Sequence, residues 1–206
     1  MSLRLASALA AGALLTAGAV GTASAQDVQK QATQRPGKVV GSLGFQMGIA
    51  SQYEFDHDDT NLQFDAQDAD LTLAIIPAVE KMLGQSVAFG AEYMFVWAKG
   101  DGADERHLIM SPHVRARMSF PVGDKVSVGA MFGIGPSIWT SAGDAEPLDS
   151  TRFGWSYRFA FGGSFAINNS VSAFADVGYY CTRTYGDDYT TTFDNIPVTV
   201  GLRSNF

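Results

Sequence analysis

The stretch VAFGAEYMFVW at residues 87–97 decides the fold, because large apolar side chains recur at alternate positions along it. Valine, phenylalanine, tyrosine and tryptophan occupy most odd positions, whereas alanine, glycine, Glu92 and Met94 lie between them. A period of two is typical of a β-strand, whose successive side chains point to opposite faces; a helix would need a period near 3.6. The stretch therefore predicts a strand with one bulky apolar face and one face of mostly small side chains.

The same alternation recurs along most of the chain and predicts eight strands. We place them at 39–53, 70–80, 86–98, 107–120, 125–139, 152–167, 170–183 and 196–206. Leu62, Phe64 and Ala66 also alternate, so the second strand is expected to extend toward its preceding connection. Most segments exceed the usual five or six residues of a soluble strand and reach the roughly 9–11 residues that a tilted strand needs to cross a bilayer.

Short and long connections alternate strictly between these strands. The short ones are 81–85, 121–124 and 168–169, and the longer polar ones are 54–69, 99–106, 140–151 and 184–195. Short periplasmic turns, long external loops and an even strand count are typical of outer-membrane barrels. Open sheet edges cannot exist in lipid, so the strands must close. The predicted fold is an all-β, closed, antiparallel, eight-stranded transmembrane β-barrel of up-and-down topology.

The bulky face is expected to contact lipid and the small face to line a narrow lumen. Eight strands leave an interior just wide enough for side chains to fill. Aromatic residues at both strand ends predict two interfacial girdles. One girdle, beside the long connections, would contain Tyr53, Trp97, Trp139, Trp155 and Tyr185, and the other Phe120, Phe165 and Phe206. These girdles disfavour the alternative of a soluble periplasmic barrel with its bulky face inside.

Composition excludes several functions. The 206 residues contain 14 Lys+Arg against 21 Asp+Glu, a net charge of −7, so the basic surface of a nucleic-acid-binding protein is missing. One cysteine permits neither an intrachain disulfide nor a cysteine-based zinc site. No GxSxG, HExxH or P-loop motif occurs. We expect no cofactor and no nucleic-acid partner.

The N-terminus is typical of an exported protein. Residues 1–25 have one positive charge at Arg4, an apolar stretch and the small-residue cleavage pattern Ala23-Ser24-Ala25, which together predict a secretory signal peptide. Residues 26–37 are polar and predict a short periplasmic lead-in, and residues 38–206 form the predicted barrel domain. An uncleaved membrane anchor is the less favoured alternative.

With these features in place, residues 38–206 resemble the small eight-stranded outer-membrane proteins of Gram-negative bacteria, such as the OmpA transmembrane domain, OmpX and the opacity-type porins. The sharpest match is the alternating end VTVGLRSNF at 198–206. The resemblance implies that Phe206 forms part of the signal read by the barrel assembly machinery, and that the protein resides in outer-membrane lipid. It implies little about activity, because fold does not fix function.

Charged side chains on the inward face are the main candidate site. They are Glu92, His113, Arg115, Arg117, Arg158, Asp176 and Arg203. Buried charges must be paired or solvated, so we predict ion pairs of Glu92 with Arg115, and of Asp176 with Arg203 or Arg158. These pairs would form either a structural plug or a gate. The assumed registers place Phe120 opposite Val126, and Thr182 opposite Pro197.

Three prolines, Pro77, Pro112 and Pro136, fall inside predicted strands, where we expect bulges or strand ends because proline removes a ladder hydrogen bond.

The long connections hold most of the carboxylates. Asp56, Asp58 and Asp59 form the densest group and are a weak candidate for Ca²⁺ or Mg²⁺, because carboxylate oxygens suit these ions but the spacing matches no EF-hand. The alternative is a solvated acidic surface.

Three functions follow from these features. We favour a structural or surface-interaction role through four acidic extracellular loops, which could bind an extracellular ligand. The alternative is a small porin for ions or small solutes, with anion preference from its inward arginines. A lipid A-modifying enzyme is less favoured: a deacylase of this shape would need a His-x-Ser pair facing lipid, whereas His107 and Ser111 are assigned to the inward face. Cys181 is expected to pack toward lipid rather than act as a redox thiol.

Overall fold

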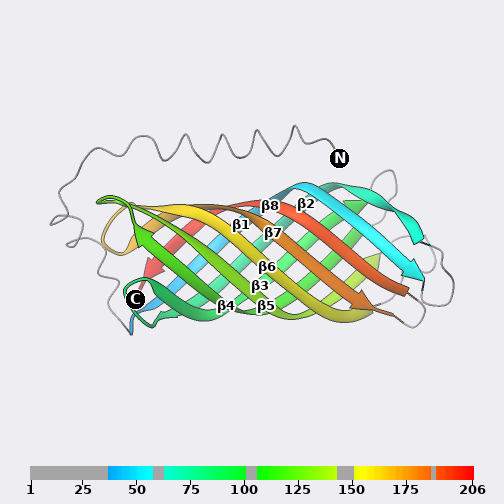
Figure 1. Ribbon diagram of the computed structural model, residues 1–206, viewed down its shortest axis with the longest axis horizontal. Coiled ribbons are helices and arrows are strands. Elements are labelled where there is room, and N and C mark those ends of the chain that lie inside the picture. The colour runs from blue at the N-terminus through cyan, green and yellow to red at the C-terminus, as the bar shows by residue number, and fades with distance from the viewer. Residues whose placement is uncertain (1–36, 58–62, 101–105, 143–150, 187–188) are drawn as a thin grey trace.

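The computed structural model describes residues 37–57, 63–100, 106–142, 151–186 and 189–206, and it confirms the predicted closed barrel (Figure 1). Every strand is antiparallel to its neighbours, and the last pairs with the first. The eight strands are β1 (Val39–His57), β2 (Gln63–Met82), β3 (Val87–Gly100), β4 (Arg106–Pro121), β5 (Val126–Ala142), β6 (Thr151–Ala166), β7 (Val171–Tyr185) and β8 (Tyr189–Asn205). No helix in the described ranges is both long and apolar enough to cross a membrane.

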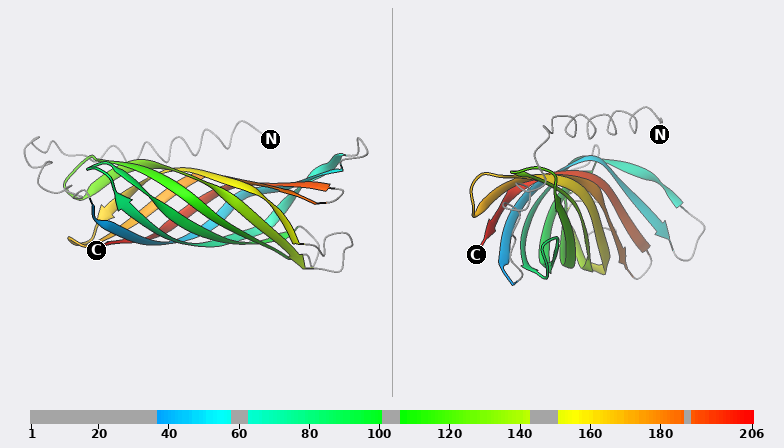
Figure 2. Two further views of the ribbon diagram at one scale, coloured as in Figure 1. Left: turned by 90° about the horizontal axis from the view of Figure 1, so that it is seen from below. Right: turned by 60° about the vertical axis from the view of Figure 1, so that its left-hand side comes forward.

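Several strands extend beyond their predicted ends. β2 begins at Gln63, so the extension that its alternating residues indicated is confirmed. β8 begins at Tyr189, so the predicted connection at 184–195 is wrong in extent, because threonine-rich sequence there pairs with β7 and β1. The β1–β2 and β7–β8 pairs project at the end opposite the C-terminus, as the left view in Figure 2 shows.

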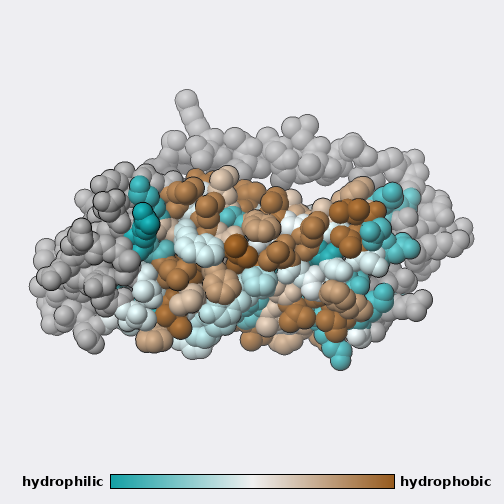
Figure 3. All heavy atoms as spheres, turned by 180° about the vertical axis from the view of Figure 1, so that it is seen from behind, coloured by the Kyte–Doolittle hydropathy of each residue, from teal (hydrophilic) through white to brown (hydrophobic). Residues whose placement is uncertain are grey.

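Bulky apolar side chains form a band on the outer wall, and Figure 3 shows one face of it, where residues of intermediate hydropathy lie among them. Phe45, Phe89, Phe132 and Phe161 are each about half exposed, as lipid-facing residues of a transmembrane barrel must be. Polar residues become frequent toward the two ends of the barrel. On β1, for example, the outer face changes from this band to Gln52 and Glu54.

Bulges occur in the wall, but not where the prolines predicted them. The register shifts between Gly48 and Ala50, between Tyr53 and Phe55, and between Ala69 and Leu71. Pro77 instead lies in an uninterrupted β1–β2 register, and Pro112 and Pro136 fall where the β4–β5 register is the same on both sides of a gap. A proline therefore removes a ladder hydrogen bond here without inserting an extra residue.

The aromatic girdle at the loop end was predicted only in part. Trp97, Trp155 and Tyr185 are exposed on the outer wall, as are Phe120, Phe165 and Phe206 at the other end. Tyr53 and Trp139 are each 2% exposed and lie inside the barrel. The bulge after Gly48 reverses the facing of the following β1 residues and turns Tyr53 inward. Trp139 continues the inward face of β5 with Met131 and Ser137, although its place at the strand end suggested a girdle.

Candidate functional site

The barrel interior is the candidate site, and the sequence predicted its facing better than its register. Phe120 pairs with Val128 instead of Val126, and Thr182 pairs with Phe193 instead of Pro197. Both assumed registers are therefore wrong, because β4 continues to Pro121 and β8 begins earlier than predicted. The errors are of two and four residues, and even shifts leave every side chain on its own face.

Glu92 lies at the centre of a buried ion cluster. Its carboxylate accepts a hydrogen bond from Arg115 Nη1 at 2.9 Å and from Arg158 Nη1 at 3.3 Å. His113 Nδ1 lies 3.1 Å from Glu92 Oε1, while its Nε2 lies 2.8 Å from Ser156 Oγ. The Glu92 side chain is fully buried, so its charge is balanced by these partners and not by bulk water.

Space for this carboxylate comes from a glycine on β5, the strand that pairs with β4. A Cβ atom built on Gly133 of β5 would lie 2.9 Å from Glu92 Oε1 and 3.2 Å from His113 Nδ1. Any larger residue at position 133 would have to displace one of the two partners. The absence of a side chain at Gly133 therefore leaves room inside the barrel for Glu92 and His113, which are register partners on the neighbouring strands β3 and β4.

A second carboxylate, Glu80 on β2, completes the cluster and was absent from the sequence prediction. It accepts hydrogen bonds from Arg115 Nε at 2.7 Å and from Arg117 Nε at 2.9 Å. The even-numbered face of the 70–80 segment is the inward one, so facing alone could have found Glu80. Arg115 thus bridges both glutamates with separate edges of its guanidinium group.

The remaining predicted charges lie nearer the C-terminal end. Arg203 Nη2 lies 3.6 Å from Asp176 Oδ2, although Asp176 pairs directly with Thr199 and not with Arg203. The guanidinium of Arg203 also lies over the ring of Phe174, 4.1 Å from its centroid. Arg158 donates from Nη2 to Thr199 Oγ1 at 2.8 Å, so it spans the interior from β6 to β8.

Aromatic side chains fill the lumen on the loop side of the ion cluster. The ring centroids of Tyr53 and Phe193 are 5.1 Å apart, and those of Tyr53 and Trp139 are 5.7 Å apart. Tyr180 continues the group at 6.2 Å from Phe193. Each of these four side chains is at most 2% exposed. The interior therefore contains an aromatic layer stacked on an ionic layer.

His107 and Ser111 both face inward, as assigned from the sequence, and each contacts an aromatic side chain of the lumen. His107 Nδ1 lies 3.3 Å from the Trp139 indole nitrogen, which donates to it. Ser111 Oγ lies 2.9 Å from the Tyr180 hydroxyl. Cys181 is only 7% exposed although it lies on the outward face, opposite Tyr157 and Asp194. These contacts pack the wall and the aromatic layer.

The candidate Ca²⁺ or Mg²⁺ site at Asp56, Asp58 and Asp59 lies mostly outside the residues that the structure describes. Asp58 and Asp59 lie outside the described residues, and only the backbone of Asp56 is described, in β1. Within the described part of the chain, no group of three or more His, Cys, Asp or Glu residues has metal-binding geometry.

Comparison with known proteins agrees with this architecture. The profile of the outer membrane protein beta-barrel domain matches residues 6–203. No curated protein matches the sequence significantly. The chain is similar in fold to the outer membrane protein AlkL, with a TM-score of 0.50 and 13% identity over 91% of this chain and 96% of that one. OprG from Pseudomonas aeruginosa gives 0.48 and 12% over 84% and 97%, and the Neisserial surface protein NspA gives 0.49 and 15% over 81% and 97%.

Proposed function

The chain belongs to the outer-membrane β-barrel protein family and resides in the outer membrane, and from this premise we propose that it is a closed barrel with a structural and surface-interaction role. Its wall would serve as a rigid membrane anchor. Its extracellular connections, which are acidic in sequence, would form the contact surface for an extracellular ligand or a divalent cation.

Occlusion of the lumen is the single observation that carries this proposal. Glu92, Arg115 and Arg158 are each at most 4% exposed, and they join three strands across the interior. The aromatic layer, with Trp139 and Phe193 in edge-to-face contact, lies on the loop side of them. A solute crossing the barrel would have to displace both layers. Leaving one member of a buried ion pair without its partner costs several kcal/mol. Spontaneous opening of the lumen, which would separate these pairs, would therefore be rare.

The porin alternative rests on the excess of inward arginine. Arg115, Arg117, Arg158 and Arg203 would favour anions if a water-filled path existed. Each of them contacts a carboxylate in the closed arrangement, however, which makes them structural partners. A catalytic role has less support, because His107 and Ser111 are engaged by aromatic residues inside the barrel.

Liposome swelling tests the proposal against the porin alternative. Vesicles containing the refolded protein should swell no faster than empty vesicles in arabinose, glycine or sodium gluconate. Protease protection of the barrel in the same vesicles would verify insertion. Swelling whose rate falls with solute size would contradict a closed barrel and establish a pore.

Phe206 is proposed to act in assembly and not in stability. Its side chain is 77% exposed, although its backbone nitrogen donates to Val39 O at 2.9 Å. The change Phe206→Ala should therefore leave the urea midpoint of the refolded barrel nearly unchanged. The free energy of unfolding should change by at most about 0.5 kcal/mol. In cells it should lower the fraction of folded protein in the outer membrane, measured by heat-modifiable gel mobility. Phe165→Ala, at the same end of the wall, is the matched control. Equal cellular loss in both variants would contradict a recognition role.

A further inference from the structure

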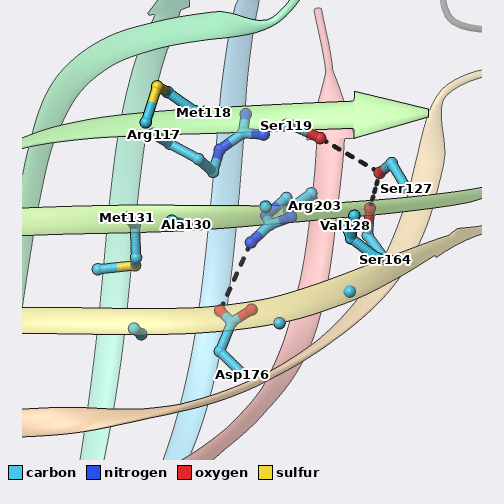
Figure 4. Close-up of a pocket in the computed structure, with 14 residues that line it drawn as sticks. Arg117, Met118, Ser119, Ser127, Val128, Ala130, Met131, Ser164, Asp176 and Arg203 are labelled. Atoms are coloured by element: carbon cyan, nitrogen blue, oxygen red, sulfur yellow. Dashed lines mark hydrogen bonds and ion pairs between the residues drawn. The ribbon is translucent and has the colours of Figure 1, made fainter. Parts of the chain in front are cut away.

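A small cavity opens between the ion cluster and the C-terminal end of the barrel, and nothing described so far uses it. The space that a water-sized particle can occupy in it is about 10 Å³. Its lining includes Arg117, Ser119, Ser127, Ser164, Asp176 and Arg203 (Figure 4). Gly129 and Gly162, which pair across β5 and β6, contribute no side chain to its wall, and Asp176 Oδ1 lies against Gly162. A space of this size holds about one water molecule or one monatomic ion.

Charge is unbalanced around this cavity. In the described part of the interior cluster, the guanidinium groups of Arg115, Arg117, Arg158 and Arg203 face three carboxylates, those of Glu80, Glu92 and Asp176. Glu80 and Glu92 are both engaged by two arginines each. Asp176 balances Arg203, so the surplus of one positive charge belongs to Arg115, Arg117 and Arg158 with their two glutamates. Arg117 is the member of this group that lines the cavity. A buried charge without a counter-charge is costly.

Hydrogen-bond donors also point to the same place. Arg203 is 8% exposed, and its Nε has no hydrogen-bond partner among the described residues. Arg117 uses its Nε on Glu80, while its Nη2 lies 4.0 Å from the Met82 sulfur, a weak acceptor. Donors outnumber acceptors at both guanidinium groups.

Three serine hydroxyls complete the donor set. Ser119 Oγ donates to Ser127 Oγ at 3.2 Å, and Ser127 Oγ lies 2.7 Å from Ser164 Oγ. Either hydroxyl of the Ser127–Ser164 pair can be the donor, because an oxygen that accepts from Ser119 still has a second lone pair. When Ser127 donates, the hydroxyl proton of Ser164 is available to an acceptor in the cavity. Figure 4 shows this hydroxyl chain beside Arg203.

We propose that this cavity binds one monatomic anion of the size of chloride. Arg117 supplies the surplus positive charge, Arg203 supplies its unpartnered Nε–H, and Ser164 supplies a neutral donor when its hydroxyl proton turns into the cavity. Asp176 lines the same cavity but is engaged by Arg203 Nη2, so it covers only one edge of that guanidinium group. The bound ion balances the surplus charge and stabilises the C-terminal half of the barrel interior.

Halide-dependent unfolding tests the site. The urea midpoint of the refolded barrel is measured in sodium chloride and in sodium gluconate at equal ionic strength. Chloride should raise the midpoint of the unmodified protein, because a ligand that binds only the folded state stabilises it. Arg203→Gln should abolish this rise and Ser164→Ala should reduce it. Arg183→Gln, which removes an exposed arginine on the outer face of β7, should keep it in full.

Crystals grown in sodium bromide give a second readout that does not depend on how the variants fold. An anomalous peak within hydrogen-bond distance of Arg203 and Ser164 is expected. A water molecule without anomalous signal there would overturn the proposal, as would equal midpoints in chloride and gluconate. A rise caused by sulfate or phosphate but not by chloride would also overturn it, in favour of an oxyanion at the mouth of the cavity.

Discussion

Replacing Glu92 with alanine is expected to lower the free energy of unfolding by about 3–5 kcal/mol, the usual cost of removing one partner of a buried ion pair. Arg115 and Arg158 would each lose a carboxylate contact, and His113 would lose the partner of its Nδ1. The guanidinium groups would remain buried beside one another, and Glu80 and Asp176 would be the remaining carboxylates of the described ion cluster. Urea unfolding in lipid vesicles, followed by tryptophan fluorescence, measures the change.

Two further variants separate charge from volume in this prediction. Glu92→Gln keeps the size and some hydrogen bonds but removes the charge, so its loss should be large and somewhat smaller than that of the alanine variant. Glu54→Ala removes an exposed carboxylate on the outer face of β1 and should change stability by at most about 0.5 kcal/mol. A midpoint unchanged by Glu92→Ala would contradict a buried cluster centred on Glu92.

Trp139→Ala should cost a similar amount, about 3–5 kcal/mol, because it removes the largest side chain of the aromatic layer and leaves a cavity. Trp139 is 2% exposed and contacts Tyr53, His107 and Phe193. The matched control is Trp155→Ala on the outer wall, where the side chain is 62% exposed. Its removal exposes no core and should be much less destabilising.

Quenching by brominated lipid provides an independent check on the same pair. Trp155 fluorescence should be quenched strongly and Trp139 fluorescence weakly, measured in variants that retain one tryptophan. Equal unfolding midpoints and equal quenching would mean that Trp139 faces lipid.

The face of the sheet on which each side chain lies was predictable from the sequence, because side chains in a strand alternate between the two faces. In a regular strand, the face of one residue therefore determines the face of every other residue. Arg115, Arg117 and Arg158 were therefore assigned inward correctly although the assumed register of β4 with β5 was wrong. Tyr53 was misassigned because a bulge at Gly48 inserts one residue, and Gly48 is not distinguished by type from Gly41 and Gly44 in the regular part of the same strand. Glu80 was missed although its facing was available.

Contacts across the lumen were less predictable than facing. Asp176 and Arg203 meet diagonally, and Arg158 reaches from β6 to Thr199 of β8. Such contacts depend on strand tilt and on the length of each side chain, which periodicity does not encode. The predicted pair of Glu92 with Arg115, by contrast, lies on the neighbouring strands β3 and β4, and its two side chains do form an ion pair.

Single-channel recording in a planar bilayer tests the closed barrel most directly. The protein is refolded without residues 1–25, its insertion is verified, and Arg115→Ala is recorded beside it. A closed lumen predicts no conductance steps from the unmodified protein in 1 M potassium chloride. Reproducible steps, with a size or ion selectivity that Arg115→Ala changes, would contradict the closed barrel and assign the interior arginines to a conducting pore.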